Sequence, residues 1–296
     1  MKGGFILPTT LSPLRYPGGK TQLCDFVEHT IEINNISDLV YCEPFSGGAG
    51  VAVSLLLNNK AESVILNDID NAIYSFWYAI LHDTEHFIQT LNDTVVDMSE
   101  WKKQRTIYDN ARLNNVQSYN FDLAFATFFL NRTNRSGIIM GGPIGGYKQK
   151  SVYKLGCRFK QSDLINKIQR IATVKERIRL YNLDAKDLIN NVLLHEDNRK
   201  LFVYFDPPYY KQGKNLYKNF YDDEEHVLLS KAIKSMDQYQ WIATYDYEQR
   251  IKDIYNDRII QEYQIQYSAN KTRKEKELIF HSPMTTIESY GRVQLT

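Results

Sequence analysis

The sequence predicts an α/β fold that is interrupted by a mainly helical, basic insertion. Near the N-terminus, an apolar run at 39–42, a glycine turn, a helical apolar run at 51–57 and a second strand-like run at 63–68 follow one another. This strand–turn–helix–strand order builds parallel sheets. Two later apolar runs, at 201–205 and 241–245, are typical of further buried strands.

Helical patterns and a terminal hairpin complete the expected order of elements. Residues 71–130 form long amphipathic runs without a proline, and residues 162–180 repeat apolar side chains at helical spacing. Segments 259–267 and 277–281 could pair around a basic loop at 271–274. We therefore expect helices between the second and third strands and an antiparallel pair at the end.

Composition excludes several classes of protein. The chain has 296 residues, of which 43% are hydrophobic and 24% charged, as in ordinary soluble domains. Its three cysteines are far apart and form no CxxC pair, so neither a zinc ribbon nor a disulfide framework is indicated, and a cytoplasmic location is expected. No signal peptide or membrane-spanning run is evident.

Charge is segregated along a chain whose net charge is only +1. Residues 61–100 contain no Lys or Arg and carry a net −8, whereas residues 131–179 hold twelve Lys and Arg against two acidic residues. Glycines and aromatic residues are interleaved with these cations, which suits contact with phosphates and unstacked bases. The alternative is a solvated basic face of a helical lobe.

The segment 43–50 carries residues suited to binding a ligand. It follows the first strand and opens a helix, and its glycines let a ligand approach main-chain N–H groups. Asp68 ends the next strand, where an acidic side chain typically binds ribose hydroxyls. An unliganded βα turn is the alternative interpretation.

The segment Asp206-Pro207-Pro208-Tyr209 follows a buried strand, and the groups near its start can only accept hydrogen bonds. Neither proline has an N–H to donate, so the Asp206 carboxylate and the Pro207 carbonyl could face an amino group with two hydrogens. Tyr209 could stack on the ring that bears this amino group. A strand-ending turn with an exposed tyrosine is the alternative.

The segment 15–21 ends in Gly-Lys-Thr like a phosphate-binding P-loop. That motif needs a glycine five residues before Gly19, where this chain has Leu14, and no strand precedes it. Nucleoside-triphosphate binding through this loop is therefore rejected. Lys20 is better interpreted as a clamp on a carboxylate or on another loop.

Taken in order, four segments resemble the Dam-like DNA adenine-N6 methyltransferases. These are Tyr16–Lys20, Glu43–Gly50, Asn67–Asp68 and Asp206–Tyr209. The likeness continues through 131–137, 245–246 and 277–279, and so covers nearly the whole chain. The glycine motif precedes the insertion and Asp-Pro-Pro-Tyr follows it, which resembles the alpha motif order. Many relatives carry Trp where this chain has Tyr16. We expect the tyrosine ring to supply the same kind of aromatic surface, with a smaller area.

The resemblance implies a Rossmann-like methyltransferase sheet with helices on both faces. Residues 1–80 and 175–296 would form the catalytic domain, and residues 81–174 an inserted DNA target-recognition domain. S-adenosylmethionine is the implied cofactor, with S-adenosylhomocysteine as its product and no metal. Double-stranded DNA is the implied partner, no membrane is involved, and a cognate restriction endonuclease is left open.

The resemblance also implies roles for individual residues. The implied catalytic residues are Asp206, Pro207, Pro208 and Tyr209. The implied cofactor-binding residues are Tyr16, Lys20, Phe45, Ser46, Gly47, Gly48, Asp68, Asp184 and Asp206. The implied DNA-binding residues are Asn131, Arg132, Arg135, Tyr147 and Lys148.

The expected activity is site-specific transfer of a methyl group to the exocyclic amino group of adenine. The base cannot be reached inside a duplex, so it must be flipped out. An RNA or protein-glutamine amide methyltransferase is an alternative, because an amide NH2 fits the same two acceptors. A catalytically inactive DNA-binding module is another. The basic insertion favours nucleic acid, and the intact Asp206–Tyr209 segment favours an enzyme.

Overall fold

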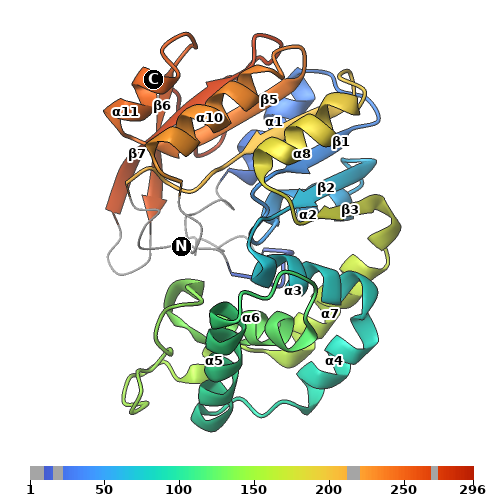
Figure 1. Cartoon of the computed structure of the whole chain (residues 1–296), viewed down its shortest axis with the longest axis vertical. Coiled ribbons are helices and arrows are strands. Elements are labelled where there is room, and N and C mark those ends of the chain that lie inside the picture. Colours follow the sequence, from blue (N-terminus) through green and yellow to red (C-terminus); the bar gives the residue numbers. More distant parts are fainter. Residues whose placement is uncertain (1–9, 16–22, 212–220, 268–272) are drawn as a thin grey trace, which may run out of the picture.

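A seven-stranded sheet with the order β3-β2-β1-β4-β5-β7-β6 forms the centre of the protein (Figure 1). The computed structural model describes residues 10–15, 23–211, 221–267 and 273–296. The strands are β1 Val40–Glu43, β2 Ser63–Asn67, β3 Ile178–Tyr181, β4 Leu201–Phe205, β5 Gln240–Asp246, β6 Gln261–Tyr267 and β7 Arg273–His281. Strands β1 to β5 are parallel, and β7 runs antiparallel to β5 and β6.

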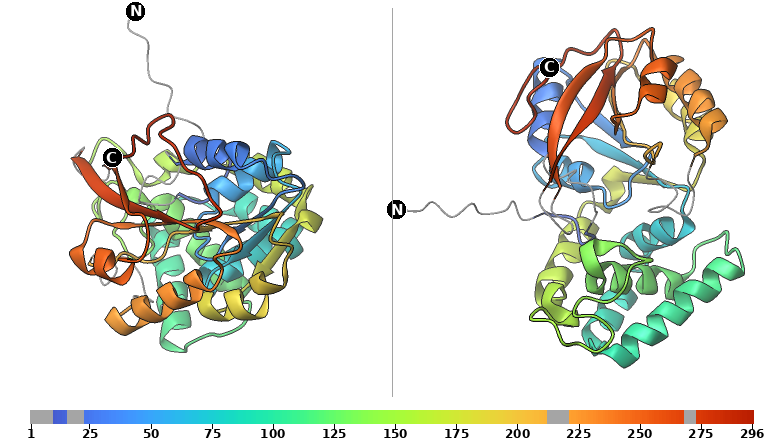
Figure 2. Two further views of the ribbon diagram at one scale, coloured as in Figure 1. Left: turned by 90° about the horizontal axis from the view of Figure 1, so that it is seen from above. Right: turned by 90° about the vertical axis from the view of Figure 1, so that its left-hand side faces the viewer.

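Helices cover both faces of this sheet. Helices α1 (Cys24–Ile33) and α2 (Gly50–Leu57) lie on one face, and α8 (Ala185–Asn191), α10 (Asp223–Lys234) and α11 (Gln249–Ile254) lie on the other (Figure 2). Successive strand residues alternate between two buried clusters: Tyr41 and Phe202 face the first, and Cys42 and Val203 the second. The expected Rossmann-like sheet with helices on both faces is confirmed.

Five helices between β2 and β3 form the lobe below the sheet in Figure 1. They are α3 Asn71–His82, α4 Thr84–Asp93, α5 Met98–Leu113, α6 Phe121–Thr133 and α7 Gln161–Ala172. The side chains of Asp70, Asp97 and Asn120 cap the N-termini of α3, α5 and α6. The helical pattern predicted over 71–130 is confirmed, with breaks at these caps and at Asp83, between α3 and α4.

The lobe is packed onto the sheet domain through shared apolar side chains. One buried cluster contains Val53 of α2, Phe76 of α3 and Phe128 of α6, and the rings of Phe76 and Phe128 are stacked with centroids 5.8 Å apart. In the part of the chain that the structure describes, no helix has the length and apolar character needed to span a membrane.

The helix predicted over 162–180 is wrong beyond Ala172, where α7 ends. Residues 178–181 instead form β3, the edge strand that pairs with β2 through Ile178 and Val64. The Arg177 guanidinium fixes this edge by donating to the carbonyl oxygens of Ala61 and Glu62 at 2.6 and 2.8 Å. Pairing with a neighbouring strand therefore overrides the local helical spacing.

Candidate functional site

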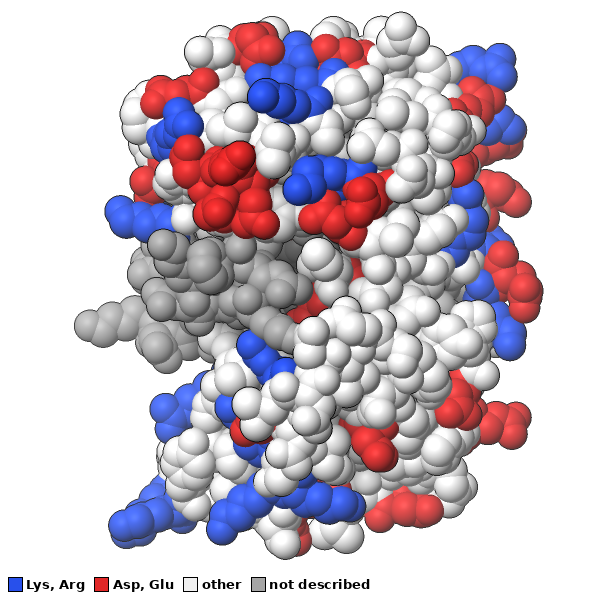
Figure 3. All heavy atoms as spheres, viewed as in Figure 1, with Lys and Arg blue, Asp and Glu red and all other residues white. Residues whose placement is uncertain are grey.

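The carboxyl ends of β2, β1 and β4 lie side by side and bring the predicted segments together. Asp68 follows β2, the glycine turn 44–49 follows β1, and Asp206 follows β4. In open parallel sheets, ligands bind at this edge. Figure 3 shows a hollow between the upper, sheet-bearing part and the lower, helical lobe, beside the residues drawn grey.

The glycine turn is held in a fixed shape. Gly47 and Ala49 have φ of 45° and 44°, the left-handed conformation that glycine adopts without strain. The Ser46 N–H donates to the Asn67 carbonyl oxygen at 2.8 Å, and the indole N–H of Trp77 donates to the Gly47 carbonyl oxygen at 2.9 Å. The turn is thus anchored to both the sheet and α3.

The Asp68 carboxylate is fixed beside this turn. Its two oxygens accept hydrogen bonds from the backbone N–H groups of Gly47 and Asp70, both at 2.9 Å. The side-chain amide of Asn182 donates to the Asp68 carbonyl oxygen at 2.7 Å. Charge-assisted bonds of this kind hold a carboxylate in one orientation, which is what binding a pair of ribose hydroxyls requires.

Asn67 ties the glycine turn to the segment that carries Asp184. Its side-chain amide donates to the carbonyl oxygens of Pro44 and Leu183 at 2.9 and 3.0 Å, and its oxygen accepts from the Leu183 N–H at 2.9 Å. Asp184 caps α8 by accepting from the Lys186 N–H at 2.8 Å. No functional role was assigned to Asn67 from the sequence, although it stands in one of the matching motifs.

Tyr221, which lies just before α10 in the chain, borders the same region. Its ring packs edge-on against Phe45 with centroids 6.1 Å apart, and its side chain is buried. Burial, followed by the charges of Asp184, Glu225 and Asp68, raises the pKa of the Tyr221 hydroxyl. Phe45, Asp68 and Asp184 therefore all lie near the position of Tyr221, a neighbour that sequence reasoning missed.

The residues around this position fit the expected cofactor. The Ser46 hydroxyl is buried, and it has no hydrogen-bond partner among the residues described. A buried polar atom of this kind is costly unless a ligand or water satisfies it. S-adenosylmethionine brings polar groups for Ser46 and hydroxyls for Asp68. Tyr16 and Lys20, the other expected cofactor contacts, lie outside the described residues.

The Asp206 carboxylate is oriented from the neighbouring strand. The Thr244 hydroxyl of β5 donates to its Oδ1 at 3.0 Å, and the hydroxyl oxygens of Tyr204 and Thr244 are 3.1 Å apart. Thr244 and Tyr204 are both buried, and Pro207 is buried beside Asp206. Thr244 was predicted only as a strand residue, because its contact with Asp206 depends on pairing of β4 with β5.

The chain beyond Pro208 is fastened by two carboxylates. The Tyr209 hydroxyl donates to Glu277 Oε1 at 2.6 Å. The N–H groups of Tyr210 and Lys211 donate to the Asp246 carboxylate at 2.9 and 3.1 Å. Burial raises the pKa of Asp246, although these two hydrogen bonds act in the opposite direction. The Asp206–Tyr209 segment is therefore anchored at both ends.

The five expected DNA-binding residues divide into exposed and buried ones. Arg135, Tyr147 and Lys148 are exposed, and the Tyr147 ring packs edge-on against Trp101 with centroids 5.6 Å apart. Arg132 is half-buried and donates to the Arg158 carbonyl oxygen. Burial, followed by the charges of Arg15 and Arg158, lowers the pKa of Arg132 to about 10.

Asn131 differs from the other four. Only 2% of its surface is exposed, and its side-chain amide is bonded to the backbone of Arg15 and Gly137. In this structure, Asn131 therefore orders the loop that follows α6 and the backbone of Arg15.

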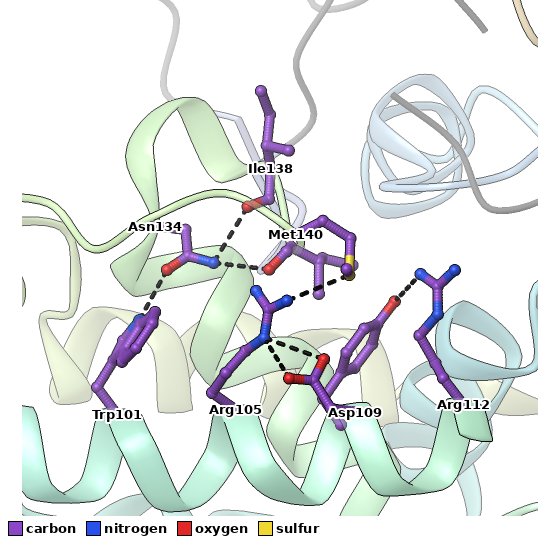
Figure 4. A network of polar contacts seen from close by, with 9 residues as sticks. Trp101, Arg105, Asp109, Arg112, Asn134, Ile138 and Met140 are labelled. Carbon is purple, nitrogen blue, oxygen red and sulfur yellow. Dashed lines mark hydrogen bonds and ion pairs between the residues drawn. The ribbon is translucent and has the colours of Figure 1, made fainter. Parts of the chain in front are cut away.

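Helix α5 supports the loop that follows α6 (Figure 4). The Trp101 indole donates to Asn134 Oδ1 at 2.8 Å, and Asn134 Nδ2 donates to the carbonyl oxygens of Ile138 and Ile139 at 3.1 and 2.7 Å. On the next turn of α5, Arg105 pairs with Asp109 and lies 3.8 Å from the Met140 sulfur. Sequence reasoning assigned no role to these α5 residues.

The cations of the basic segment are mostly not neutralised by carboxylates. Within 131–179 of the described chain, two ion pairs form: Lys160 with Asp163 at 3.8 Å, and Arg179 with Glu196 at 2.6 Å. Lys154 and Lys167 donate to backbone carbonyl oxygens instead. Figure 3 shows Lys and Arg side chains gathered on the lower left of the helical lobe. Unpaired positive charge on one lobe suits a polyanionic partner.

Across the residues that the structure describes, no group of three or more His, Cys, Asp and Glu side chains could hold a metal ion. The expectation that the protein needs no metal stays a prediction.

Comparison with known proteins identifies one family. The family model described as "D12 class N6 adenine-specific DNA methyltransferase" matches residues 16–272. No curated protein matches the chain significantly. Two similar solved structures are a candidate RNA methyltransferase of Pyrococcus horikoshii and the rRNA methyltransferase aviRa of Streptomyces viridochromogenes. The first is 10% identical with a TM-score of 0.40, covering 94% of this chain and 88% of that one. The second is 12% identical with a TM-score of 0.32, covering 86% and 83%.

Proposed function

This chain belongs to the D12 class of N6 adenine-specific DNA methyltransferases, and we propose that it methylates a flipped adenine within a specific sequence of double-stranded DNA. Membership makes the chain an enzyme that uses S-adenosylmethionine and acts on DNA. The observation that carries the proposal is the position of Asp206 at the end of β4. This strand is the neighbour of β1, which leads into the glycine turn, and Asp68 follows β2 on the other side of β1.

In this proposal, Asp206 and the Pro207 carbonyl hold the two hydrogens of the adenine amino group. The lone pair of that nitrogen is delocalised into the ring, and two acceptors would rehybridise the nitrogen and direct its lone pair outward. Thr244 supports this role because its hydroxyl hydrogen bond fixes one oxygen of Asp206. Asp206 therefore orients the amine rather than acting as a strong base.

We assign the cofactor to the region bounded by the glycine turn, Asp68 and Asp184. S-adenosylmethionine supplies a methyl group activated by its sulfonium. Asp68 would accept from the ribose hydroxyls, Phe45 would pack on the cofactor, and the buried Ser46 hydroxyl would meet one of its polar groups. Gly47 and Gly48 would let the cofactor approach the backbone closely.

We further propose that residues 81–174 form a DNA target-recognition domain, in which Arg135, Tyr147 and Lys148 face the duplex. Their exposure and the scarcity of ion pairs in the basic segment support this assignment. Tyr209 would form the stacking face for the flipped base. A cognate restriction endonuclease stays a prediction.

The proposal is tested by methyl transfer from radiolabelled S-adenosylmethionine to duplex DNA, RNA and a glutamine-containing protein. We expect label in duplex DNA as N6-methyladenine, and sequencing of methylated genomic DNA from expressing cells should show one recognition sequence. Asp206→Ala should abolish transfer, while Asp253→Ala, which removes an exposed carboxylate on α11, should not. Label in RNA or protein alone, or normal turnover by Asp206→Ala, would contradict the proposal.

A further inference from the structure

We propose that Asn131 is a positioning residue that fixes the segment 10–15 between the helical lobe and the glycine turn. It would thereby set the affinity for the cofactor rather than contact DNA. The inference rests on the proposed function, because it takes the glycine turn to be part of the cofactor site.

The Asn131 amide is bonded to backbone groups on two sides. Its Oδ1 accepts from the Arg15 N–H at 2.7 Å, and its Nδ2 donates to the carbonyl oxygens of Arg15 and Gly137 at 2.6 and 2.9 Å. An amide has two N–H donors, and both are used here. With only 2% of its surface exposed, Asn131 has no donor left for a base or a phosphate.

The loop after α6 meets the segment 10–15 backbone to backbone. Gly137 has a φ of 78°, and a β-carbon added to it would lie 2.6 Å from the Arg15 carbonyl oxygen. A contact this close excludes any other residue at Gly137 without a backbone shift. The Arg15 guanidinium also donates to the Asn134 carbonyl oxygen at 3.2 Å. The end of the segment is therefore clamped to the loop from both sides.

The other part of the segment is attached to the glycine turn. The buried Ser12 hydroxyl donates to the Gly48 carbonyl oxygen and accepts from the Leu14 N–H at 3.2 Å. The Lys167 ammonium of α7 donates to the Thr10 carbonyl oxygen at 2.5 Å. The segment 10–15 thus joins two helices of the lobe to the turn, and the next residue in the chain is Tyr16.

Loss of the Asn131 amide would deprive Arg15 of hydrogen bonds on both its backbone groups. Buried backbone groups without partners are costly, so the segment would shift to regain them. Because Ser12 connects the same segment to Gly48, the shift would reach the turn. Asn134, three residues along, offers a matched comparison: it is equally buried, but its amide binds Trp101, Ile138 and Ile139 instead.

The test compares Asn131→Leu with Asn134→Leu in the full chain. Each replaces a buried amide with an apolar side chain of similar size. Titration with S-adenosylhomocysteine without DNA should show a dissociation constant about tenfold higher for Asn131→Leu, about 1.4 kcal/mol, and less than twofold higher for Asn134→Leu. Affinity for the cognate duplex, measured without cofactor, should fall more for Asn134→Leu.

Ser12→Ala keeps the inference testable if Asn131→Leu fails to fold. It removes only the connection to Gly48 and should also weaken S-adenosylhomocysteine binding, and in the double variant the two effects should not add. Unchanged cofactor affinity in either soluble single variant, or a loss of DNA affinity alone in Asn131→Leu, would overturn the inference. Failure of the wild-type chain to bind S-adenosylhomocysteine would instead overturn the proposed function, and the inference with it.

Discussion

The hydroxyl of Tyr209, which follows β4, donates a 2.6 Å hydrogen bond to Glu277 on β7, two strands away in the sheet. Glu277 is buried, and its second oxygen accepts from the Tyr263 hydroxyl on β6. The ring proposed to stack on the flipped base is therefore held by its far end against the antiparallel pair of strands. A stacking face fixed in this way does not have to be ordered when the base arrives.

Replacing Tyr209 with Phe should lower kcat by about tenfold, in line with the loss of one charge-assisted hydrogen bond. The ring is kept, but its orientation is no longer fixed and Glu277 loses a donor. Cofactor affinity should change little, since the lost bond is to β7 and not to the glycine turn or Asp68. Single-turnover methylation of the cognate duplex measures the effect. Tyr263→Phe removes the other bond to Glu277 and should cost stability rather than turnover.

Asp68→Ala should weaken S-adenosylmethionine binding by about 1.5–3 kcal/mol, the range for a hydrogen bond to a charged acceptor. It also removes the acceptor for the Gly47 and Asp70 N–H groups. Asp68→Asn keeps one side-chain oxygen and should lose less. Isothermal titration calorimetry gives both values. Equal affinity in all three proteins would mean that the ribose hydroxyls bind elsewhere.

Stability should fall on acidification because of His226. The imidazole is buried among the rings of Tyr210, Tyr221 and Tyr245, and neither nitrogen has a hydrogen-bond partner among the described residues. Burial lowers the pKa of His226 from 6.5 to about 4, against the opposing charges of Asp223 and Asp222.

The unfolded chain therefore binds more protons than the folded one between pH 6.5 and 4. Stability is highest above this window and decreases as the pH falls through it, by up to about 3 kcal/mol from this one group. In urea unfolding series, His226→Phe should flatten the pH dependence, whereas His82→Phe, at an exposed position, should not. Parallel curves for wild type and His226→Phe would refute this assignment.

Cations that meet only phosphates should behave differently from those that read bases. Lys148→Ala or Lys150→Ala should weaken binding to every sequence alike and lower the slope of log affinity against log salt by about 1. Arg135→Ala should cost about 1–3 kcal/mol on the cognate duplex and relax the sequence preference. Titrations with cognate and scrambled duplexes at several salt concentrations separate the two patterns. If all three variants keep wild-type affinity, the exposed loop does not face DNA.

The central strands could be predicted from the sequence because both of their faces are buried. Every residue of β4 is buried, so the strand is a continuous apolar run. At the edge, β3 is half-exposed and mixes Arg179 with apolar residues, and its pairing with β2 is invisible in a local pattern. Helices α8 and α11 have seven and six residues, too few for a helical repeat to be recognised.

The residues of the candidate site likewise divide into those that could be predicted from the sequence and those that could not. Asp68 and Asp206 could be predicted because each directly follows a recognisable strand, so adjacent residues define its place. Thr244 and Glu277 reach the site only through strands that are neighbours in space. The burial of Asn131 was equally hidden, since its partner Arg15 lies 116 residues away in the chain.

The parallel strands β2 and β3 lie side by side in the sheet. The chain between them, which includes the whole helical lobe, is therefore a single long crossover connection. Strand pairing sets a minimum length for a crossover but no maximum. The outer helices, and the loop after α6 beyond Gly137, can therefore be exchanged between relatives without rearranging the strands. Such an exchange must keep Asn131, Gly137 and Lys167, because these residues hold the segment 10–15, which is bonded to the glycine turn. In the proposed division of roles, sequence preference and transfer chemistry can therefore diverge at separate rates within one polypeptide.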